Sequence, residues 1–315
     1  MRSGVCRHRI RWSFRHAPNS KFVFTDHQKT PNTIDAYTVS ASGKLTLVTG
    51  SPFPAGTTPF SLAVDSTSQF LYVANINSSD VWAYRINHTT GALTKIKAYT
   101  TDLLSPDSIA VDPTGRFLLV TVICCGNPGA GVTVFTINPS SGTLSPVTGS
   151  PFALPSGMGS ASAVTVDPTG RFAYVCGGSQ SGLSGVVAFS VNSNTGALTL
   201  VTPAPVLGGV APWDLAVDPE DRFLYMTNND ATISGYSIDN ATGVPTQISR
   251  SPFLASGATR GIVVDPSDKF VYLVDASHTL GYSIDTSTGS LTLLPSSPFA
   301  SGLDPISLTV SGTVK

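Results

Sequence analysis

The chain has 315 residues, of which 41% are hydrophobic and only 12% charged, and its formal net charge is −1. Its 29 glycines and 23 prolines disfavour a helical protein, because both residues are poor in helix interiors. The apolar fraction is too high for a disordered chain, and no apolar run approaches the roughly 18–20 residues of a membrane-spanning helix, which excludes helical integral membrane proteins.

The chain begins with a basic segment. Its first 20 residues carry five arginines and no acidic residue, whereas the rest carries 13 basic and 19 acidic side chains. A mildly acidic body matches a phosphate backbone poorly, so we expect no nucleic-acid partner. The basic start lacks the apolar stretch of a signal peptide, and the compartment, cytoplasmic or extracytoplasmic, stays open. We interpret residues 1–16 as a basic leader or a degenerate first strand, and residues 17–315 as one domain.

From residue 17 onward the chain consists of repeats. An apolar run that ends in Asp, followed by a short turn and an aromatic residue, ends at Asp65, Asp112, Asp167, Asp218 and Asp265. A polar turn with glycine recurs every 46 to 54 residues, at Gly43, Gly91, Gly142, Gly196, Gly243 and Gly289. A third marker, Ser-Pro-Phe, begins at Ser51, Ser150, Ser251 and Ser297. Motifs that share one period indicate six copies of a single unit.

Each unit is expected to form four strands. In the unit that spans residues 60–99 they are predicted at 60–64, 70–74, 81–86 and 92–96. Residues 81–86 alternate, with Val81 and Ala83 on one side and Trp82 and Tyr84 on the other. The Asp-Pro-Thr-Gly link is typical of a type I turn, so the repeated aspartates are interpreted as turn residues and not as catalytic carboxylates.

Four short antiparallel strands per repeat, with no room for a helix, are typical of a β-propeller. We therefore predict an all-β protein, a propeller of six four-stranded antiparallel blades. Residues 306–310 resemble a spare first strand, and residues 12–16 a poor one. We expect the C-terminal strand to pair with the N-terminal blade and close the ring, which would leave no edge unpaired.

Several motifs resemble those of the lactonase-family β-propellers. They are Val-Asp-Pro-Thr-Gly-Arg-Phe, the strand that ends at Asn75, Tyr-Ser-Ile-Asp at Asp239, Thr-Gly-Ala-Leu and Ser-Pro-Phe. That family includes propeller-type 6-phosphogluconolactonase and is similar to surface-layer propellers with Tyr-Val-Thr-Asn repeats. The resemblance covers residues 17–315 and implies the fold, although family members are usually seven-bladed. It also implies a Glu, His and Arg set in the channel, whereas the one Glu of this chain, Glu220, lies in a turn on the opposite face.

The turns after the first and third strands are uniform, whereas the loops after the second and fourth strands vary, which favours the variable face as the ligand face. Its polar residues are Asp26, His27, Lys29, Asn75, Asp107, Trp213, Asp214, Asn228, Asn229, Asp230, Arg260, Asp275, His278 and Asp304. Ring closure would make the first and last units neighbours, so His27 and His278 are expected to share a rim with Asp26, Asp275 and Arg260. Either histidine is a candidate general base and Arg260 a candidate anchor for an acidic group.

The remaining candidates are expected to bind a ligand. They are Asp26, Lys29, Asp107, Trp213, Asp214, Asn228, Asp275 and Asp304. Trp213 can stack on a sugar ring or pack between blades. Asn75, Asn228 and Asp275 alternatively cap the turn after the second strand.

Two functions stay open. The first is a non-catalytic propeller that binds a small ligand, a glycan or a protein on the variable face. The second is an enzyme, a carboxylic ester hydrolase acting on a sugar lactone at the channel mouth.

No cofactor is required by either function, although a Ca²⁺ ion would find oxygen ligands in Asp26, Asp275 and Asp304. We expect a monomer with no membrane span. Cys124, Cys125 and Cys176 are interpreted as buried apolar residues, with a bridge to Cys176 as the alternative.

Overall fold

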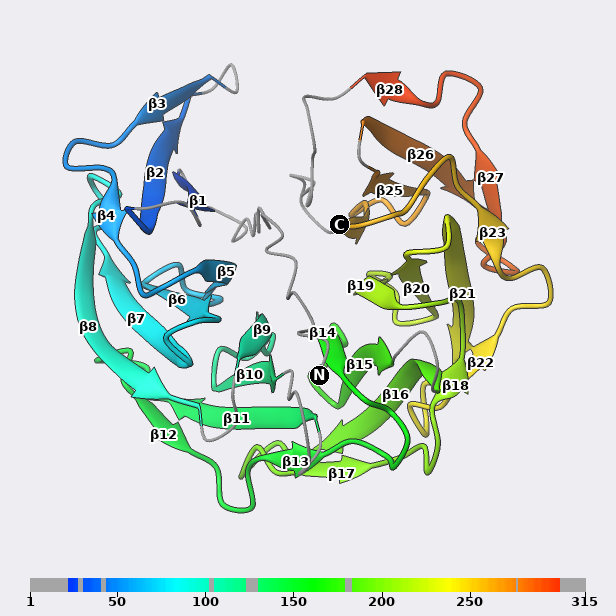
Figure 1. Ribbon diagram of the computed structural model, residues 1–315, viewed down its shortest axis with the longest axis horizontal. Coiled ribbons are helices and arrows are strands. Elements are labelled where there is room, and N and C mark those ends of the chain that lie inside the picture. The colour runs from blue at the N-terminus through cyan, green and yellow to red at the C-terminus, as the bar shows by residue number, and fades with distance from the viewer. Residues whose placement is uncertain are drawn as a thin grey trace, which may run out of the picture.

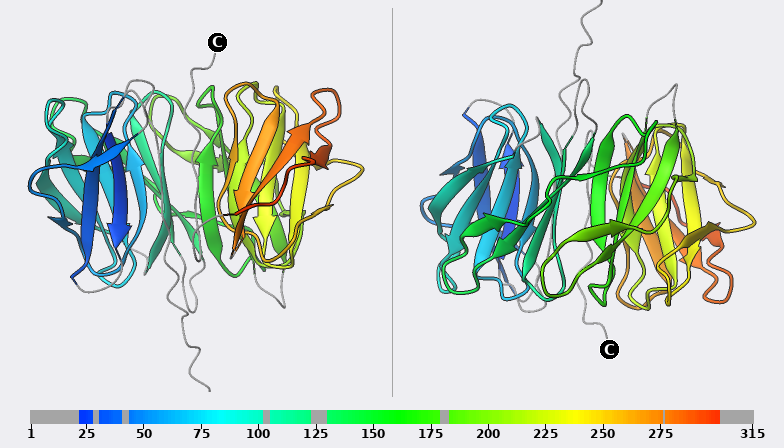
Figure 2. Two further views of the ribbon diagram at one scale, coloured as in Figure 1. Left: turned by 90° about the horizontal axis from the view of Figure 1, so that it is seen from above. Right: turned by 90° about the horizontal axis from the view of Figure 1, so that it is seen from below.

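The computed structural model describes residues 22–27, 31–40, 44–101, 105–122, 130–178, 183–275 and 277–300. These residues form 28 β-strands in six antiparallel sheets, which surround a common axis (Figure 1). Seen from the side, the strands of the sheets run between the two faces of the ring (Figure 2). The predicted all-β class and propeller arrangement are confirmed. In this part of the chain there is no helix that could cross a membrane.

Consecutive strands build each sheet. The first sheet contains β1 (Phe22–His27), β2 (Thr33–Val39), β3 (Leu45–Leu47) and β4 (Phe53–Pro54). The second contains β5 (Pro59–Val64), β6 (Phe70–Asn75), β7 (Asp80–Ile86) and β8 (Leu93–Thr100). The third contains β9 (Pro106–Val111), β10 (Phe117–Val122), β11 (Gly131–Ile137), β12 (Leu144–Pro146) and β13 (Phe152–Ala153).

The other three sheets repeat the pattern. The fourth contains β14 (Ala161–Val166), β15 (Phe172–Gly178), β16 (Ser184–Val191), β17 (Leu198–Leu200) and β18 (Val206–Leu207). The fifth contains β19 (Pro212–Val217), β20 (Phe223–Asn228), β21 (Thr232–Ile238), β22 (Pro245–Gln247) and β23 (Phe253–Leu254). The sixth contains β24 (Ile262–Val264), β25 (Phe270–Val274), β26 (His278–Ile284), β27 (Leu291–Leu293) and β28 (Phe299–Ala300).

The fourth strand of the expected unit is split in two wherever Ser-Pro-Phe occurs. The serine hydroxyl accepts a backbone hydrogen bond from the third strand, as Ser150 does from Val134 N at 2.8 Å, and Ser51, Ser251 and Ser297 do the same. The Ser–Pro peptide bonds are cis. The fourth sheet lacks the motif and is still split, into β17 and β18, and there the Thr202 hydroxyl accepts the Ala188 backbone N–H at 3.0 Å. The second sheet also lacks the motif, and its outer strand β8 is continuous and longer than the predicted 92–96.

Neighbouring sheets pack through a repeated contact between an aromatic ring and a glycine. A Cβ on Gly142 would lie 2.2 Å from Cδ1 of Phe70 in the preceding sheet, and the φ of Gly142 is +71°. Four further pairs have the same contact: Phe22 with Gly91, Phe117 with Gly196, Phe172 with Gly243, and Phe223 with Gly289. The periodic glycines therefore adopt the positive φ that the turn requires, and they leave room for the phenylalanine ring of the preceding sheet.

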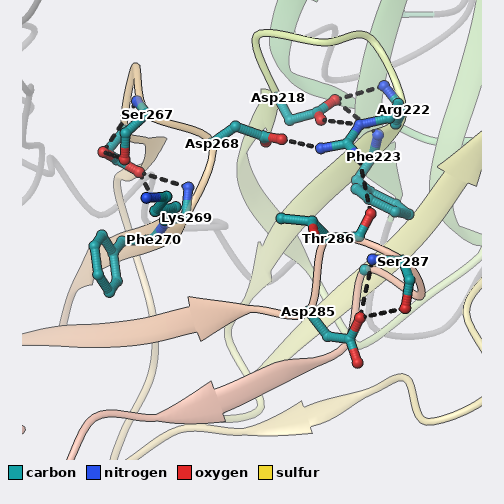
Figure 3. A network of polar contacts seen from close by, with 12 residues as sticks. Asp218, Arg222, Phe223, Ser267, Asp268, Lys269, Phe270, Asp285, Thr286 and Ser287 are labelled. Carbon is teal, nitrogen blue, oxygen red and sulfur yellow. Dashed lines mark hydrogen bonds and ion pairs between the residues drawn. The ribbon is translucent and has the colours of Figure 1, made fainter.

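The repeated aspartates have the turn role that the sequence predicted. Asp112 Oδ1 accepts the backbone N–H of Phe117 at 2.7 Å, and the other four aspartates bond the equivalent phenylalanine. Arginines on the same face tie adjacent sheets together. Arg222 donates to the Thr286 carbonyl at 2.8 Å and to the Asp268 carboxylate, and its Nε lies 3.4 Å from Asp218 Oδ2 (Figure 3).

Some predictions fall outside the described residues. The two segments expected to close the ring, 12–16 and 306–310, lie there, so closure stays a prediction. Cys176 is fully buried in β15, whereas Cys124 and Cys125 lie outside, and the alternative of a bridge between them also stays a prediction.

Candidate functional site

We define the loop face as the side of the ring that carries the connections into the first strand of each sheet, such as residues 55–58. The turn face, on the other side, carries the aspartate turns at Asp65, Asp112, Asp167, Asp218 and Asp265. In sheets two to five the innermost strands are β5, β9, β14 and β19, and they surround the ring axis (Figure 1). Their first residues lie at the loop face.

Each of these inner strands has a bulge close to its start. The pairing register skips one residue, and the skipped residues are Phe60, Asp107, Ser162 and Trp213. A bulge leaves one residue unpaired and changes the direction of its side chain. Arg260 has the corresponding position in the sixth sheet, five residues before its turn aspartate. We call these five the axial residues.

The axial residues have equivalent backbone positions and unlike side chains. Phe60 and Asp107 are buried, whereas Ser162, Trp213 and Arg260 are half-buried. The repeat therefore conserves geometry at this position and leaves the chemistry free to vary, as expected for a ligand face on a rigid scaffold. The three half-buried axial residues, Ser162, Trp213 and Arg260, come from the fourth, fifth and sixth sheets.

Thr227 joins the axial residue Arg260 to Asp214, which follows the axial residue Trp213. The Thr227 hydroxyl accepts the backbone N–H of Asp214 at 3.1 Å and donates to the Arg260 carbonyl at 2.5 Å. The Asp214 carboxylate accepts its neighbour's backbone N–H, from Leu215, at 3.0 Å. The structure thus brings Trp213, Asp214 and Arg260, all predicted site residues, to one junction between the fifth and sixth sheets.

Asn228 is hydrogen-bonded to Thr259, the residue before Arg260 at this junction. Its backbone N–H donates to the Thr259 hydroxyl at 3.0 Å, and that hydroxyl donates to the Asn228 carbonyl at 2.8 Å. Its amide also donates to Thr232 Oγ1 and Ser234 Oγ, each at 3.0 Å. Asn228 is fully buried, so it fixes the backbone next to Arg260 and does not face solvent.

Each of the two candidate histidines, His27 and His278, has a carboxylate partner within its own sheet. His27 Nε2 lies 2.8 Å from Asp35 Oδ2, and the Tyr37 hydroxyl donates to the same oxygen at 3.1 Å. Burial, together with the hydrogen bond to Asp35, raises the pKa of Tyr37. Asp26 was expected on the same rim as His27, but successive strand residues face opposite sides, and Asp26 is fully buried.

His278 lies beside Asp275, with 3.4 Å between Nδ1 and Oδ1. The Asp275 carboxylate accepts the backbone N–H groups of Ser277 and His278 and a hydrogen bond from Ser256. Burial acts to raise the pKa of Asp275, but these hydrogen bonds outweigh it and hold the pKa below its usual value. This is the geometry of a turn cap.

The other predicted residues have separate surroundings. Asn75 donates to Asp80 at 3.0 Å, and the Asp230 carboxylate accepts the Val210 backbone N–H at 2.8 Å. Asn229 donates its backbone N–H to the Val210 carbonyl at 3.0 Å. Lys29 and Asp304 lie outside the described residues.

Sequence reasoning missed five contributors to these clusters: Asp35, Phe60, Ser162, Thr227 and Thr259. Counting five residues back from each turn aspartate would have found Phe60 and Ser162. Asp35 lies two pairs along the register of β1 and β2 from His27, on the same side of the sheet. In the described part of the chain, no three His, Cys, Asp or Glu side chains are grouped to hold a metal ion.

Several solved structures of known proteins share the fold of this chain. A candidate 6-phosphogluconolactonase from Bacteroides fragilis superposes with a TM-score of 0.76 and 19% identity, over 92% of this chain and 84% of its own. A protein from Lactobacillus plantarum gives a TM-score of 0.75 at 19% identity, over 95% and 86% of the two chains. The periplasmic gluconolactonase of Pseudomonas aeruginosa gives 0.53 at 15% identity, over 93% and 96%.

At such identities these structures establish the propeller fold and nothing about chemistry. No curated protein matches the sequence. The family model described as "Lactonase, 7-bladed beta-propeller" matches residues 13–103 and 132–256, more than half of the chain. The resemblance predicted from the repeat motifs is confirmed, and this chain belongs to the lactonase family of β-propellers.

Proposed function

We propose that this chain is a ligand-binding propeller that holds a small acidic sugar derivative on its loop face, at the junction between the fifth and sixth sheets. The observation that carries the proposal is the connection through Thr227 of the backbones of Asp214, the residue after Trp213, and Arg260. An indole ring offers a stacking surface for a sugar, and a guanidinium binds a carboxylate in two-pronged fashion. The carboxylate of Asp214, the residue after Trp213, can accept hydrogen bonds from sugar hydroxyls.

The carboxylates of the loop face favour a binding role over a catalytic one. Asp275 and Asp230 already accept backbone N–H groups in turns, and the one Glu of the chain is exposed on the turn face. A general base needs a pKa near the working pH, whereas the hydrogen bonds to Asp275 hold its pKa low.

The second candidate function is hydrolysis of a sugar lactone. The His27–Asp35 pair favours it, because a carboxylate that orients an imidazole is the arrangement of a general base. In this mechanism His27 takes a proton from water as the water attacks the lactone carbonyl. The imidazolium then gives that proton to the ring oxygen, which leaves as a hydroxyl when its bond to the carbonyl carbon breaks. Membership of the lactonase family supports it as well.

Isothermal titration of the purified chain tests the first candidate. The probes are D-gluconate, D-glucuronate and, as an uncharged match, D-glucose. We expect the acids to bind and the sugar to bind at least tenfold more weakly, since only the acids meet the guanidinium. Arg260→Ala is expected to remove that difference, and Trp213→Ala to weaken all three probes. The matched control is Arg250→Ala, because Arg250 is an exposed arginine between β22 and β23 of the fifth sheet.

The same preparations test the second candidate with D-glucono-δ-lactone, with and without EDTA. Turnover that Asp35→Asn and His27→Ala both abolish would establish the hydrolase. Acid binding that is unchanged in Arg260→Ala would overturn the proposed binding site, and turnover without acid binding would reverse the order of the two functions.

A further inference from the structure

The inner strand of the sixth sheet starts differently from the inner strands of the four sheets before it. β5, β9, β14 and β19 each begin six residues before the turn aspartate, and that first residue pairs with a residue near the end of the second strand of its own sheet. β24 begins three residues later, at Ile262. The segment that is left outside the regular strand, residues 259–261, contains Arg260, the candidate anchor for an acidic group.

Thr259 takes the position that proline has in three of the four preceding inner strands. The prolines are Pro59, Pro106 and Pro212, and the fourth sheet has Ala161 there. Proline has no backbone N–H and therefore cannot donate a hydrogen bond from this position. Threonine supplies the N–H and adds a hydroxyl group that can both donate and accept.

Both groups of Thr259 bond to the fifth sheet. Its backbone N–H donates to the Asn228 carbonyl at 3.2 Å, and its hydroxyl donates to the same oxygen at 2.8 Å and accepts the Asn228 backbone N–H at 3.0 Å. Within the fifth sheet Asn228 is paired with Pro212, which has no N–H to donate, so the Asn228 carbonyl is left for Thr259. Thr259 is fully buried, so these bonds are protected from water.

The peptide backbone at Arg260 is held from two sides. Its N–H donates to the Val274 carbonyl of its own sheet at 2.8 Å, whereas its carbonyl accepts the Thr227 hydroxyl of the fifth sheet at 2.5 Å. The same hydroxyl accepts the backbone N–H of Asp214 at 3.1 Å. The backbone at Arg260 is therefore fixed relative to the backbone at Asp214, the residue after Trp213.

Thr121 in the third sheet shows that this bridge between sheets is not a general feature of the repeat. It has the position of Thr227, four residues after the phenylalanine that begins the second strand, and both threonines are fully buried. The Thr121 hydroxyl accepts the Ser108 backbone N–H at 2.9 Å and lies 3.3 Å from the Ser108 carbonyl. Within the described residues its hydrogen bonds stay in the third sheet, whereas Thr227 also reaches the sixth.

We infer that Thr227 and Thr259 are positioning residues, which hold the Arg260 backbone on the fifth sheet and so fix the point from which its guanidinium reaches an acidic ligand. The inference rests on the proposed function for the role of Arg260 itself. An anchor on an ordered backbone loses less conformational entropy on binding, and a site that has the binding geometry for only part of the time binds more weakly in proportion. Loss of either hydroxyl therefore weakens the binding of acids more than the binding of neutral sugars.

Isothermal titration with D-glucuronate and D-glucose tests this role. The ratio of the two affinities reports the contribution of the guanidinium, because only glucuronate carries a carboxylate. Thr227→Val and Thr259→Val each remove one hydroxyl and keep the shape of the side chain. We expect each to lower the ratio by about threefold or more, the effect of losing one hydrogen bond that orders the anchor. Thr227→Ser and Thr259→Ser keep the hydroxyl and are expected to keep the ratio.

The matched control is Thr121→Val, which removes an equally buried hydroxyl from the same strand position of the third sheet. We expect it to lower the thermal midpoint to a similar extent as Thr227→Val and to leave the affinity ratio unchanged. A ratio that Thr227→Val and Thr259→Val both leave unchanged, or that Thr121→Val lowers as much as they do, would overturn the inference.

Hydrogen exchange at single amides tests the positioning without a ligand. The Arg260 amide bonds to Val274 and to neither threonine, so a change in its exchange rate reports the order of the segment and not the loss of its own partner. We expect Thr227→Val and Thr259→Val to accelerate its exchange by about threefold or more and Thr121→Val to leave it unchanged. An Arg260 amide that exchanges at the parent rate in both variants would overturn the inference. A parent chain that binds glucuronate no more tightly than glucose would overturn the proposed function, and the exchange rates would still decide whether the two threonines hold this backbone.

Discussion

The carboxylates of Asp167 and Asp221 face each other across the junction between the fourth and fifth sheets, and a guanidinium nitrogen of Arg171 lies 3.7 Å from Asp221. Both carboxylates are buried, Asp221 being 3% exposed. Asp221 has a φ of 58° at the turn position that Gly115 and Gly170 occupy in the preceding sheets. Its side chain therefore projects onto the turn of the neighbouring sheet.

Burial and the nearby Asp167 raise the pKa of Asp221 to about 6, from an ordinary value of 3.8. The folded state thus holds this proton more tightly than the unfolded state does. Its stability is expected to fall as the pH rises from about 4 to 6 and to stay reduced above that range. Asp221→Asn removes the charge and keeps a residue that tolerates positive φ.

We expect Asp221→Asn to stabilise the protein by about 1–3 kcal/mol at pH 8 and to have little effect at pH 4, since about two pKa units correspond to that range. Thermal melts of both proteins from pH 4 to pH 8 measure the difference. Asp230→Asn is the control, because Asp230 is exposed. A pH-independent difference between Asp221→Asn and the parent would contradict the electrostatic explanation.

The only Glu of the chain removes a hydrogen bond that the other turns have. In four turns a hydroxyl two residues after the aspartate donates to its carboxylate, at Thr67, Thr114, Thr169 and Ser267. Glu220 takes that position in the fifth sheet, and burial raises the pKa of Asp218 there. The turn of the fifth sheet therefore has an acidic side chain at the position where the other four turns have a hydroxyl that donates a hydrogen bond.

We expect Glu220→Thr to restore the bond to Asp218 and to stabilise the fold by about 0.5–1.5 kcal/mol at pH 7, the usual range for one hydrogen bond. Chemical unfolding at pH 7 gives the change. Glu220→Val is the matched control, because valine has the shape of threonine and no hydroxyl. Equal stability of the threonine and valine variants would show that the hydrogen bond is not the cause.

The fold was predictable from the sequence to a greater extent than the site. The repeated aspartates and glycines have fixed roles: Asp112 bonds the Phe117 backbone, and Gly142 admits the ring of Phe70. Roles of this kind need particular residue types at every repeat, so they leave a periodic signal. The axial position tolerates Phe, Asp, Ser, Trp and Arg because only its backbone is specified, so its own residue type carries no signal and only its distance from the turn aspartate marks it.

The His27–Asp35 pair was missed for a different reason. Its partners are close because of the β1–β2 register, which pairs His27 with Thr33 and Thr25 with Asp35. The number of residues between the two strands does not by itself indicate this register. Asp26, which was expected on the same rim as His27, lies on the other side of the strand.

The contact between glycine and phenylalanine should make Gly243 intolerant of any side chain. A Cβ at this position would lie 2.3 Å from Cδ1 of Phe172, and its φ is +74°. We expect Gly243→Ala to destabilise the protein by about 1 kcal/mol for the backbone conformation and about 1–3 kcal/mol more for the overlap. The change in thermal midpoint measures the total.

Gly170→Ala separates the two contributions. Gly170 has a φ of +73°, and the nearest atom to a Cβ there is 3.8 Å away. It should therefore lose only the backbone contribution. If both alanine variants lose the same stability, close packing against Phe172 is not what makes glycine necessary at position 243.

Two buried tyrosines at equivalent positions differ in whether the hydroxyl has a partner. Tyr225 donates to the Gly289 carbonyl of the sixth sheet at 2.8 Å, whereas the Tyr174 hydroxyl has no hydrogen-bond partner among the described residues. Both rings are fully buried. Loss of a satisfied buried hydrogen bond costs about 1–2 kcal/mol, because the carbonyl is left unpaired, whereas removal of an unpaired hydroxyl costs nothing.

We therefore expect Tyr225→Phe to lower the unfolding free energy by about 1–2 kcal/mol and Tyr174→Phe to leave it unchanged or raise it. Urea unfolding of the two variants side by side gives the comparison, and a larger loss in Tyr174→Phe would mean that the hydroxyl of Tyr174, and not that of Tyr225, links adjacent sheets.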